Sequence, residues 1–196
     1  MTDATTTRQR RLRVDAQRNT DALLDAAKTA FATSGVDAPA KEISGLAGVG
    51  VGTLYRHFPR RSDLVVAVLR REIDACADAG PALGAAHEPA DALAQWLHRY
   101  AAFVATKRGL ATALHSGDPA FDALPSYFFE RLGPVLSDLL DAAASAGEIR
   151  ADVIAKELLT AVALLCQPAP DTGPEYSQRM VGLLIDGLRN PERAQP

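Results

Sequence analysis

The segment 47–61 holds most of the side chains that could bind another molecule through hydrogen bonds and charge. At helical spacing, Leu54 and Phe58 share one side of a short helix and would anchor it to the rest of the protein. The other side offers hydroxyl, guanidinium and imidazole groups, which bond base edges and phosphates when a helix lies in the major groove of DNA. Arg60 and Arg61 follow, placed to bond flanking phosphates. The residues predicted to contact DNA are Lys41, Ser44, Gly50, Val51, Gly52, Thr53, Tyr55, Arg56, His57, Arg60 and Arg61.

Glycines divide this region into two short helical stretches, residues 39–47 and 51–58. Two short helices joined by a tight, glycine-bearing turn are typical of a helix-turn-helix. Gly50 and Gly52 also remove side-chain bulk near the start of the second helix, so its backbone N–H groups could approach phosphates closely. A nucleotide-binding loop is excluded, because no strand precedes the glycines and no Lys-Ser/Thr pair follows them.

The rest of the chain predicts an all-α fold of about nine helices. One helix runs from near Asp15 or Thr20 to Ser34 and stops at Gly35. Gly133-Pro134 should kink or split one of the later helices. The expected later helices span residues 61–79, 89–107, 110–115, 121–146, 153–167 and 175–189.

Three parts of the chain are expected to differ in organisation. Residues 1–17 are polar and basic, with Arg8, Arg10, Arg11 and Arg13, and are predicted to have no fixed fold. They are either a solubilising tail or an arm along the DNA backbone or in its minor groove. Residues 18–60 form the predicted DNA-binding domain, and residues 61–196 form a helical domain for ligand binding and dimerisation.

Composition limits the class of protein. The 196 residues carry a net charge of -3 and are 47% hydrophobic, which excludes disorder of the whole chain. Residues 1–72 hold 12 Lys and Arg against 8 Asp and Glu, so the basic end suits a polyanion while the remainder is acidic. Cys76 and Cys166 lack the spacing of a zinc site or a disulfide framework, and no cofactor is expected. With no membrane span or signal segment, a cytoplasmic protein is expected.

The stretch Ala47-Gly48-Val49, followed by Gly52-Thr53-Leu54-Tyr55-Arg56-His57-Phe58-Pro59, resembles the recognition-helix signature of the TetR (tetracycline-repressor) family of bacterial regulators. The resemblance covers roughly residues 15–72. The segment Leu93 to Leu114, with Trp96 and Lys107-Arg108-Gly109-Leu110, is similar to the ligand domain of the SbtR subgroup. Membership implies a homodimer that binds a double-stranded DNA operator and often holds a small effector.

The resemblance also implies roles for single residues. Tyr55 and His57 match phosphate-contacting positions, Thr53 matches a base or phosphate contact, and Arg61 stands where the family commonly has a lysine. The chain departs from the family at Gly50, where serine is frequent, and at Val51, where the residue is often polar. Base recognition should therefore depend more on Thr53 and Arg56.

The last two predicted helices are apolar on more than one side, which predicts a subunit interface. We expect a two-fold dimer through a four-helix bundle, with a monomeric bundle core as the alternative. The residues predicted at this interface are Ile154, Leu158, Leu159, Val162, Leu165, Tyr176, Met180, Leu183, Leu184 and Leu188.

Aromatic residues between these two regions suggest an effector pocket for a small apolar or aromatic molecule. Plain core packing is the competing interpretation of the same pattern. The predicted lining residues are Trp96, Tyr100, Phe103, His115, Tyr127, Phe128 and Leu132.

The function predicted from these features is a sequence-specific transcription regulator, a repressor that a small effector releases from its operator. The alternative is an architectural DNA-binding protein without an effector, whose C-terminal domain binds a protein partner. An enzyme is not expected, because His115, Ser116 and Asp118 lie too close along one loop to form a nucleophile-base pair.

Overall fold

The computed structural model describes residues 3–106, 116–167 and 175–189, with side chains described from Asp15 onward. The chain divides into two compact units. Residues 1–69 and 109–122 form the N-terminal unit, and residues 70–108 and 123–196 form the C-terminal unit. The division falls at 69/70 and not at the predicted 60/61, because the first turns of the fourth helix are part of the N-terminal unit, where Leu64 and Val65 are buried.

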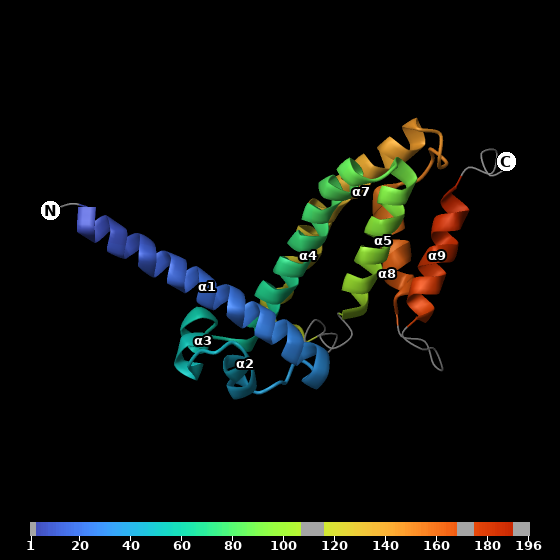
Figure 1. The fold of residues 1–196 in the computed structure, drawn as a ribbon. Coiled ribbons are helices and arrows are strands. Elements are labelled where there is room, and N and C mark those ends of the chain that lie inside the picture. Colours follow the sequence, from blue (N-terminus) through green and yellow to red (C-terminus); the bar gives the residue numbers. More distant parts are fainter. Residues whose placement is uncertain (1–2, 107–115, 168–174, 190–196) are drawn as a thin grey trace. The chain divides into compact units, whose positions relative to one another are not determined.

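Within the N-terminal unit, two short helices lie against a long one (Figure 1). Its core holds Leu23, Ala27 and Phe31 from the long helix, with Ile43 and Leu54 from the short ones. The elements are α1 (Asp3–Ser34), α2 (Ala40–Leu46), α3 (Val51–His57), the beginning of α4 (Arg61–Ala86) and the 3-10 turn η2 (Pro119–Phe121).

The prediction that residues 1–17 have no fixed fold is wrong for the described part of that segment, since α1 begins at Asp3. The segment contains no glycine or proline, and the packed part of α1 has already formed the helical nucleus. Each further turn then adds hydrogen bonds without a new nucleation cost. The predicted stop at Gly35 is confirmed, because this residue has φ +74°, a conformation that favours glycine.

The C-terminal unit is a helical bundle around α5, which packs against α7, α8 and α9 and donates hydrogen bonds to α4. Its core includes Trp96 and Tyr100 from α5, Leu136 from α7, Leu159 from α8 and Val181 from α9. The elements are the rest of α4, α5 (Pro89–Thr106), α7 (Leu124–Ser145), α8 (Ala155–Leu165) and α9 (Tyr176–Leu188).

Two prolines that were expected to end or split helices lie inside continuous helices. α4 continues through Gly80-Pro81 to Ala86, and α7 passes Gly133-Pro134 without a break. At Gly80 a β-carbon would collide with the Val135 side chain, so glycine allows α4 and α7 to pack closely there. Packing of this kind offsets the hydrogen bond that a helical proline removes.

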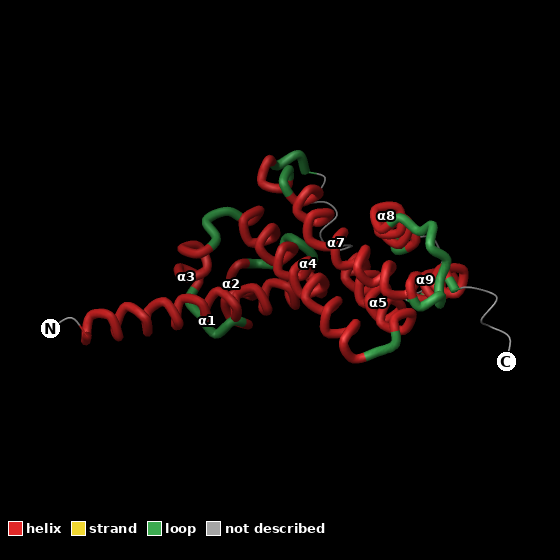
Figure 2. The backbone as a smooth tube through the Cα atoms, turned by 90° about the horizontal axis from the view of Figure 1, so that it is seen from above, coloured by secondary structure: helices red, strands yellow, loops and turns green. Residues whose placement is uncertain are grey.

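Every regular element in the described ranges is a helix and none is a strand, as Figure 2 shows. The nearest approach to a sheet there is an isolated β-bridge between Ile149 and Arg189. The all-α prediction is confirmed. The expected helix at 110–115 lies outside the described residues. Among the helices that the structure does describe, none has the length and apolar character needed to cross a membrane.

Candidate nucleic-acid interface

The turn between α2 and α3 is fixed by glycine at its centre. Gly48 has φ +67°, the left-handed conformation that side chains with a β-carbon avoid. The Gly48 N–H donates to Gly45 O at 3.2 Å, and the Val49 N–H donates to Ser44 O at 3.0 Å. This pair of bonds satisfies the free carbonyls at the end of α2 and turns the chain directly into α3.

α3 is anchored by its buried Leu54 and is exposed on the opposite side. Leu54 is 3% exposed, whereas its neighbour Tyr55 is 54% exposed. Val51, Gly52 and Arg56 are also exposed. The predicted opposition of an apolar anchor and a polar outer surface is therefore present, and the outer surface is free to enter a groove.

The exposed side of α3 has its own internal bond. The Arg56 guanidinium donates through Nη2 to Thr53 Oγ1 at 3.2 Å. Thr53 and Arg56 are the two residues predicted to contact bases. Their hydrogen bond holds the Arg56 guanidinium, with its several N–H donors, beside Thr53 on the helix surface.

His57 lies at the end of α3, half-buried, with its Nδ1 3.2 Å from Thr20 Oγ1 on α1. The contact joins the end of the short helix to the long one. One ring nitrogen is therefore already bonded within the protein, which leaves only the other for the predicted phosphate contact.

A hollow of about 290 Å³ lies beside α3 in the N-terminal unit. Leu54, Phe58 and Leu64 are its apolar lining, and Tyr55 and Arg60 contribute polar groups. The remaining lining residues are Asp37, Ala38, Pro39, Ala40 and Arg61. The hollow therefore combines apolar side chains with groups of both charges, since Asp37 lines it together with the two arginines.

Arg61 is directed into the protein, in contrast to its predicted phosphate contact. Its Nε donates to Val36 O at 2.8 Å and its Nη2 donates to Ala38 O. The guanidinium also lies 5.3 Å from the centre of the Phe31 ring, within cation–π range. Burial lowers the pKa of Arg61 from its ordinary value. Its part in this structure is to hold the loop before α2.

Arg60 points outward and pairs with Asp63 on the first turn of α4. Its Nη2 lies 2.7 Å from Asp63 Oδ1, and its backbone N–H donates to Oδ2 of the same carboxylate. The hydrogen bond from Arg60 lowers the pKa of Asp63. The pair is solvent-exposed, so a phosphate can compete for the arginine at small cost.

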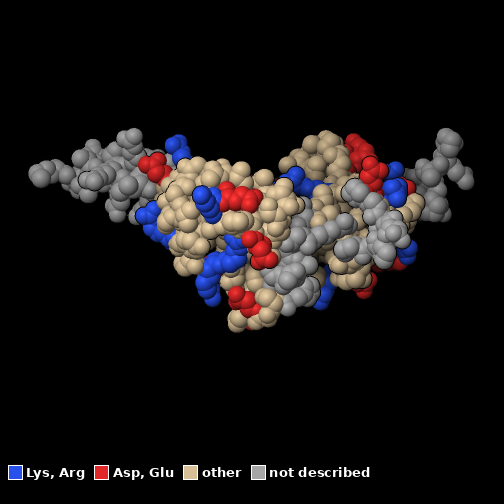
Figure 3. All heavy atoms as spheres, turned by 90° about the horizontal axis from the view of Figure 1, so that it is seen from below, with Lys and Arg blue, Asp and Glu red and all other residues tan. Residues whose placement is uncertain are grey.

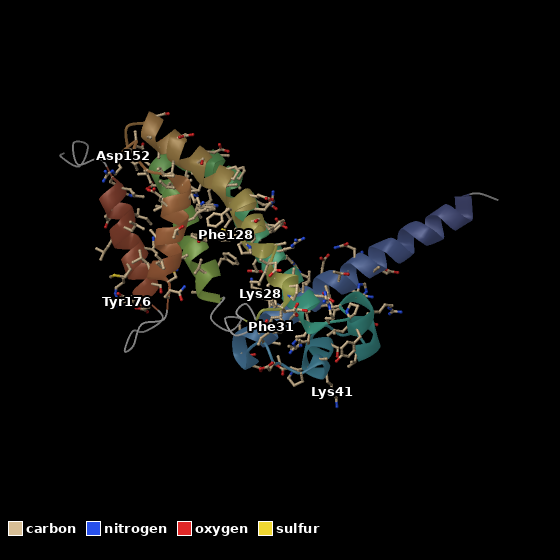
Figure 4. All side chains as sticks on the ribbon, turned by 180° about the vertical axis from the view of Figure 1, so that it is seen from behind. Lys28, Phe31, Lys41, Phe128, Asp152 and Tyr176 are labelled. Atoms are coloured by element: carbon tan, nitrogen blue, oxygen red, sulfur yellow. The ribbon has the colours of Figure 1, made fainter. Side chains whose placement is uncertain are left out.

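On α2, the two predicted contacts separate into one exposed and one buried residue. Lys41 extends away from the protein (Figure 4). The prediction for Ser44 is wrong, since its side chain is buried and its hydroxyl donates to Lys41 O. Position 44 faces the core because it is adjacent to Ile43 and carries the carbonyl that ends α2.

Basic and acidic side chains share the surface of this unit. On the surface shown in Figure 3, Lys and Arg side chains (blue) and acidic side chains (red) are interspersed over the N-terminal unit. The excess of positive charge at the N-terminal end of the sequence comes mainly from Arg8, Arg10, Arg11 and Arg13.

The predicted effector residues are largely core in the C-terminal unit. Trp96 donates to Cys76 O at 2.9 Å and Tyr100 donates to Leu159 O at 3.0 Å, so both polar tips are satisfied by backbone carbonyls. Phe103 and Leu132 are buried as well, whereas Phe128 is half-buried 5.8 Å from the Tyr100 ring. His115 lies outside the described residues.

Tyr127 belongs to a polar network between α4 and α7. Its hydroxyl donates to Asp74 at 2.7 Å, and Arg131 Nε binds the same carboxylate at 2.7 Å. The Arg70 guanidinium lies 4.6 Å from the centre of the tyrosine ring. Burial, and then the bond to Asp74, raise the pKa of Tyr127. Sequence spacing did not indicate this network, because Arg70 and Asp74 on α4 are 53 or more residues from Tyr127 and Arg131 on α7.

The predicted interface residues fall into two groups. Leu158, Leu159, Val162 and Leu188 are buried within the unit itself. Leu183 is 65% exposed and Ile154 is 56% exposed, while the remaining four predicted residues are half-buried. Leu164, at 66% exposed, was missed. It stands seven residues after Glu157 and four after Thr160, so a leucine on an otherwise polar side of α8 was the signal that could have found it.

Of the three residues considered for a nucleophile-base pair, the structure describes Ser116 and Asp118. Asp118 accepts the Ala120 N–H at 2.9 Å and so caps η2. The Ser116 hydroxyl accepts the Asp118 N–H. These bonds hold the loop, which is a structural task.

A short exposed helix, anchored by one leucine and preceded by a glycine turn, defines a helix-turn-helix DNA-binding protein. The model of the bacterial regulatory proteins of the tetR family matches residues 23–68, and that of the SbtR-like transcriptional regulator C-terminal domain matches residues 88–190. The chain belongs to the TetR family, and it is a DNA-binding transcription regulator and not an enzyme.

Solved structures agree with this assignment. A TetR regulator from Streptomyces coelicolor is 36% identical, with 87% of this chain and 98% of that chain covered and a TM-score of 0.70. One from Mycobacterium vanbaalenii is 35% identical, with 91% and 99% covered and a TM-score of 0.71. A TetR-family regulator from Rhodococcus sp., 20% identical, shares the fold, with 89% and 100% covered and a TM-score of 0.67. The comparison with curated proteins gives no match.

Proposed function

We propose that the protein is a homodimeric repressor that binds a specific operator through α3 and leaves it when a small apolar or aromatic effector binds the C-terminal unit. The observation that supports this most is the opposition of Leu54 and Tyr55 on a seven-residue helix. A side chain as large as tyrosine, exposed next to a buried anchor, is expected where a partner surface covers it.

In this proposal, phosphate contacts and base contacts come from different residues. Tyr55 and Arg60, with Lys41 on α2, bind phosphates and set the position of the protein on the duplex. Thr53 and Arg56 face base edges, and Val51 contacts a thymine methyl group. Two copies of α3 must then lie ~34–36 Å apart to enter successive major grooves.

Effector release requires that the ligand prefer a dimer form that fits DNA poorly. The loss of DNA affinity equals the difference in ligand affinity between the two forms. Phe128 and Tyr127 are the predicted effector residues that keep partial exposure, so we place the ligand beside them and not around Trp96.

The test of operator binding begins with duplexes selected from a random pool by the wild-type protein. The selected duplex should bind at least about a thousandfold more tightly than a scrambled one at physiological salt. Tyr55→Ala should weaken both complexes and leave the melting temperature nearly unchanged. Leu54→Ala should lower stability by roughly 2–5 kcal/mol because it empties a buried site. Equal affinity of the wild type for both duplexes would exclude specific regulation.

The test of effector release uses the emission of the lone Trp96, which is fully buried in the C-terminal core. Small aromatic molecules are screened for a change in emission together with dissociation of the selected duplex. Tyr127→Phe, which removes the bond to Asp74, should alter the response and leave operator affinity without ligand unchanged. Tight binding of operator with no releasing ligand would favour the architectural alternative.

A further inference from the structure

We propose that residues 3–18 of α1 are a second DNA-contacting element, which lies as a helix along the phosphate backbone and outside the minor groove. We call these residues the basic arm. The inference rests on the proposed function and adds to it a contact surface outside the helix-turn-helix.

The basic arm is the most strongly positive part of the chain. It holds five arginines, Arg8, Arg10, Arg11, Arg13 and Arg18, and its only acidic residues are Asp3 and Asp15. The whole chain has a net charge of -3, so this excess is local. A cluster of arginines on one short segment is the electrostatic mark of a nucleic-acid contact.

The arm extends beyond the folded core of the N-terminal unit. The described side chains from Asp15 to Arg18 are exposed, and the buried residues of α1 begin at Leu23. The family model also begins at residue 23, so the arm is not part of the match. Neither core packing nor the family pattern therefore accounts for its arginines.

The arm starts next to the helix that enters the groove. Thr20 contacts His57 at the end of α3, with 3.2 Å between Thr20 Oγ1 and the His57 ring. From Thr20 back to Arg8, an α-helix advances ~18 Å. Figure 1 shows α1 continuing past α2 and α3. This part of the helix therefore runs beside the proposed α3 contact, where phosphates flank the groove.

The helical form decides how the arm binds. An α-helix with side chains is ~10–12 Å across, whereas the minor groove of B-DNA is ~6 Å wide. A helical arm cannot enter that groove as an extended chain does. We therefore assign the contacts of the arm to phosphates, which contribute affinity and salt dependence but no base preference.

A membrane surface fits the arm less well. A helix that lies in a bilayer interface needs a broad apolar face. The only large apolar residues of the arm are Leu12 and Val14. A polyanion without an apolar layer, such as duplex DNA, matches this composition.

The test uses the full-length protein with Arg8, Arg10, Arg11 and Arg13 all changed to glutamine, which removes four charges and retains helix propensity. Affinity for the selected and scrambled duplexes is measured by fluorescence anisotropy over a range of salt. Both affinities should fall about tenfold or more near 0.1 M salt, with their ratio unchanged. The slope of log K against log salt should shrink by ~0.9 for each lost contact, or ~1.8–3.6 for two to four contacts.

The control variant removes the same charge from the C-terminal unit by changing Arg99, Arg150, Arg179 and Arg189, all exposed, to glutamine. Its salt slope should equal that of the wild type. An arm variant whose slope also equals that of the wild type, or a control that loses as much as the arm variant, overturns the proposal. A chain that lacks residues 2–13 should reproduce the loss, which guards against an effect of glutamine itself.

Exchange of A·T for G·C pairs in the flanks distinguishes phosphate contact from minor-groove insertion. The contribution of the arm should not change; a contribution confined to A·T flanks would contradict a helical arm. The proposal would also be overturned if the full-length protein bound phosphatidylserine vesicles more tightly than duplex DNA and the arm variant lost that binding. The salt slope of the arm variant can be measured on any duplex, including the scrambled one, so this test does not depend on specific operator binding. The regulator proposal fails only if the wild type does not prefer its selected duplex.

Discussion

Arg60 and Arg61 are neighbours in the chain, but their guanidinium groups have different surroundings. Arg61 is half-buried and bonds the carbonyl oxygens of Val36 and Ala38, whereas Arg60 makes an exposed pair with Asp63. The first arrangement supports the fold of the N-terminal unit. The second leaves a cation available at the protein surface.

We therefore expect the two alanine variants to separate stability from DNA binding. Arg61→Ala should lower the unfolding free energy by roughly 1–3 kcal/mol, because two part-buried carbonyls lose their donor. Arg60→Ala should change stability little and reduce the salt slope of DNA binding by ~0.9. Urea unfolding and anisotropy titrations measure both effects. If folded Arg61→Ala protein also shows a reduced salt slope, then Arg61 contacts a phosphate and this assignment is wrong.

Tyr100 makes stability depend on pH in the alkaline range. Burial raises the pKa of its hydroxyl above the ordinary value, so the folded protein keeps the proton at high pH. The unfolded chain releases that proton near pH ~10. The contribution of Tyr100 to stability is therefore complete below about pH 10 and declines as pH rises above it.

Tyr100→Phe removes this dependence. At pH 8 the variant should be less stable by about 1 kcal/mol, since the bond to Leu159 O is lost. Between pH 9 and about 11 its unfolding free energy should fall less steeply than that of the wild type. Urea unfolding over this range gives the comparison, and parallel curves for the two proteins would contradict the assignment.

At the scale of elements, the α2–α3 pair depends on glycine for two different reasons. Gly48 is needed by the fold, because its φ of +67° strains residues that carry a β-carbon. Gly52 has a helical conformation, and a β-carbon there would meet no atom within 4 Å. Packing within the unit therefore does not require glycine at position 52.

Alanine substitutions should have opposite effects on stability at these two positions. Gly48→Ala should destabilise the protein by about 1–2 kcal/mol. Gly52→Ala should stabilise it by about 0.5–1 kcal/mol, as is usual within a helix. The same methyl group would stand between α3 and the duplex, so DNA affinity should fall although Tm rises. Unchanged affinity of Gly52→Ala would show that α3 is not closely approached at this residue.

At the scale of the whole molecule, exposed leucine and isoleucine side chains on the last two helices indicate how two chains associate. Ile154, Leu164 and Leu183 are each more than half exposed. Exposed apolar surface of this kind on a soluble domain is expected at a subunit interface. The buried members of the predicted set instead hold the unit together.

Leu183→Glu should give a folded monomer, because the side chain contributes little to its own core. Sedimentation should show the loss of the dimer, and affinity for a duplex with two half-sites should fall more than affinity for a single half-site. Ala85→Glu, at an exposed position of α4, is the matched control and should remain dimeric. A dimeric Leu183→Glu would place the interface elsewhere.

Features that depend on near neighbours in the chain could be predicted without the structure. Helical spacing of Leu54 and Phe58 and the glycine at position 48 predicted the helix-turn-helix, because a short helix, its anchor and its turn are set within a dozen residues. The all-α fold followed from the same periodicity. The family resemblance, based on the residues of that segment, was confirmed by the matches to both domains.

Which side of each helix is covered depends on how the helices pack together. Ser44 is buried, Arg61 turns toward the α1–α2 loop, and Leu164 is exposed where Leu159 is not. Periodicity shows that a helix has an apolar side, but the helices that cover that side come from distant parts of the chain. The partners of Arg61 lie 23 and 25 residues away, and Tyr100 bonds a carbonyl 59 residues away. Contacts at such separations depend on how the helices pack, which no local pattern encodes.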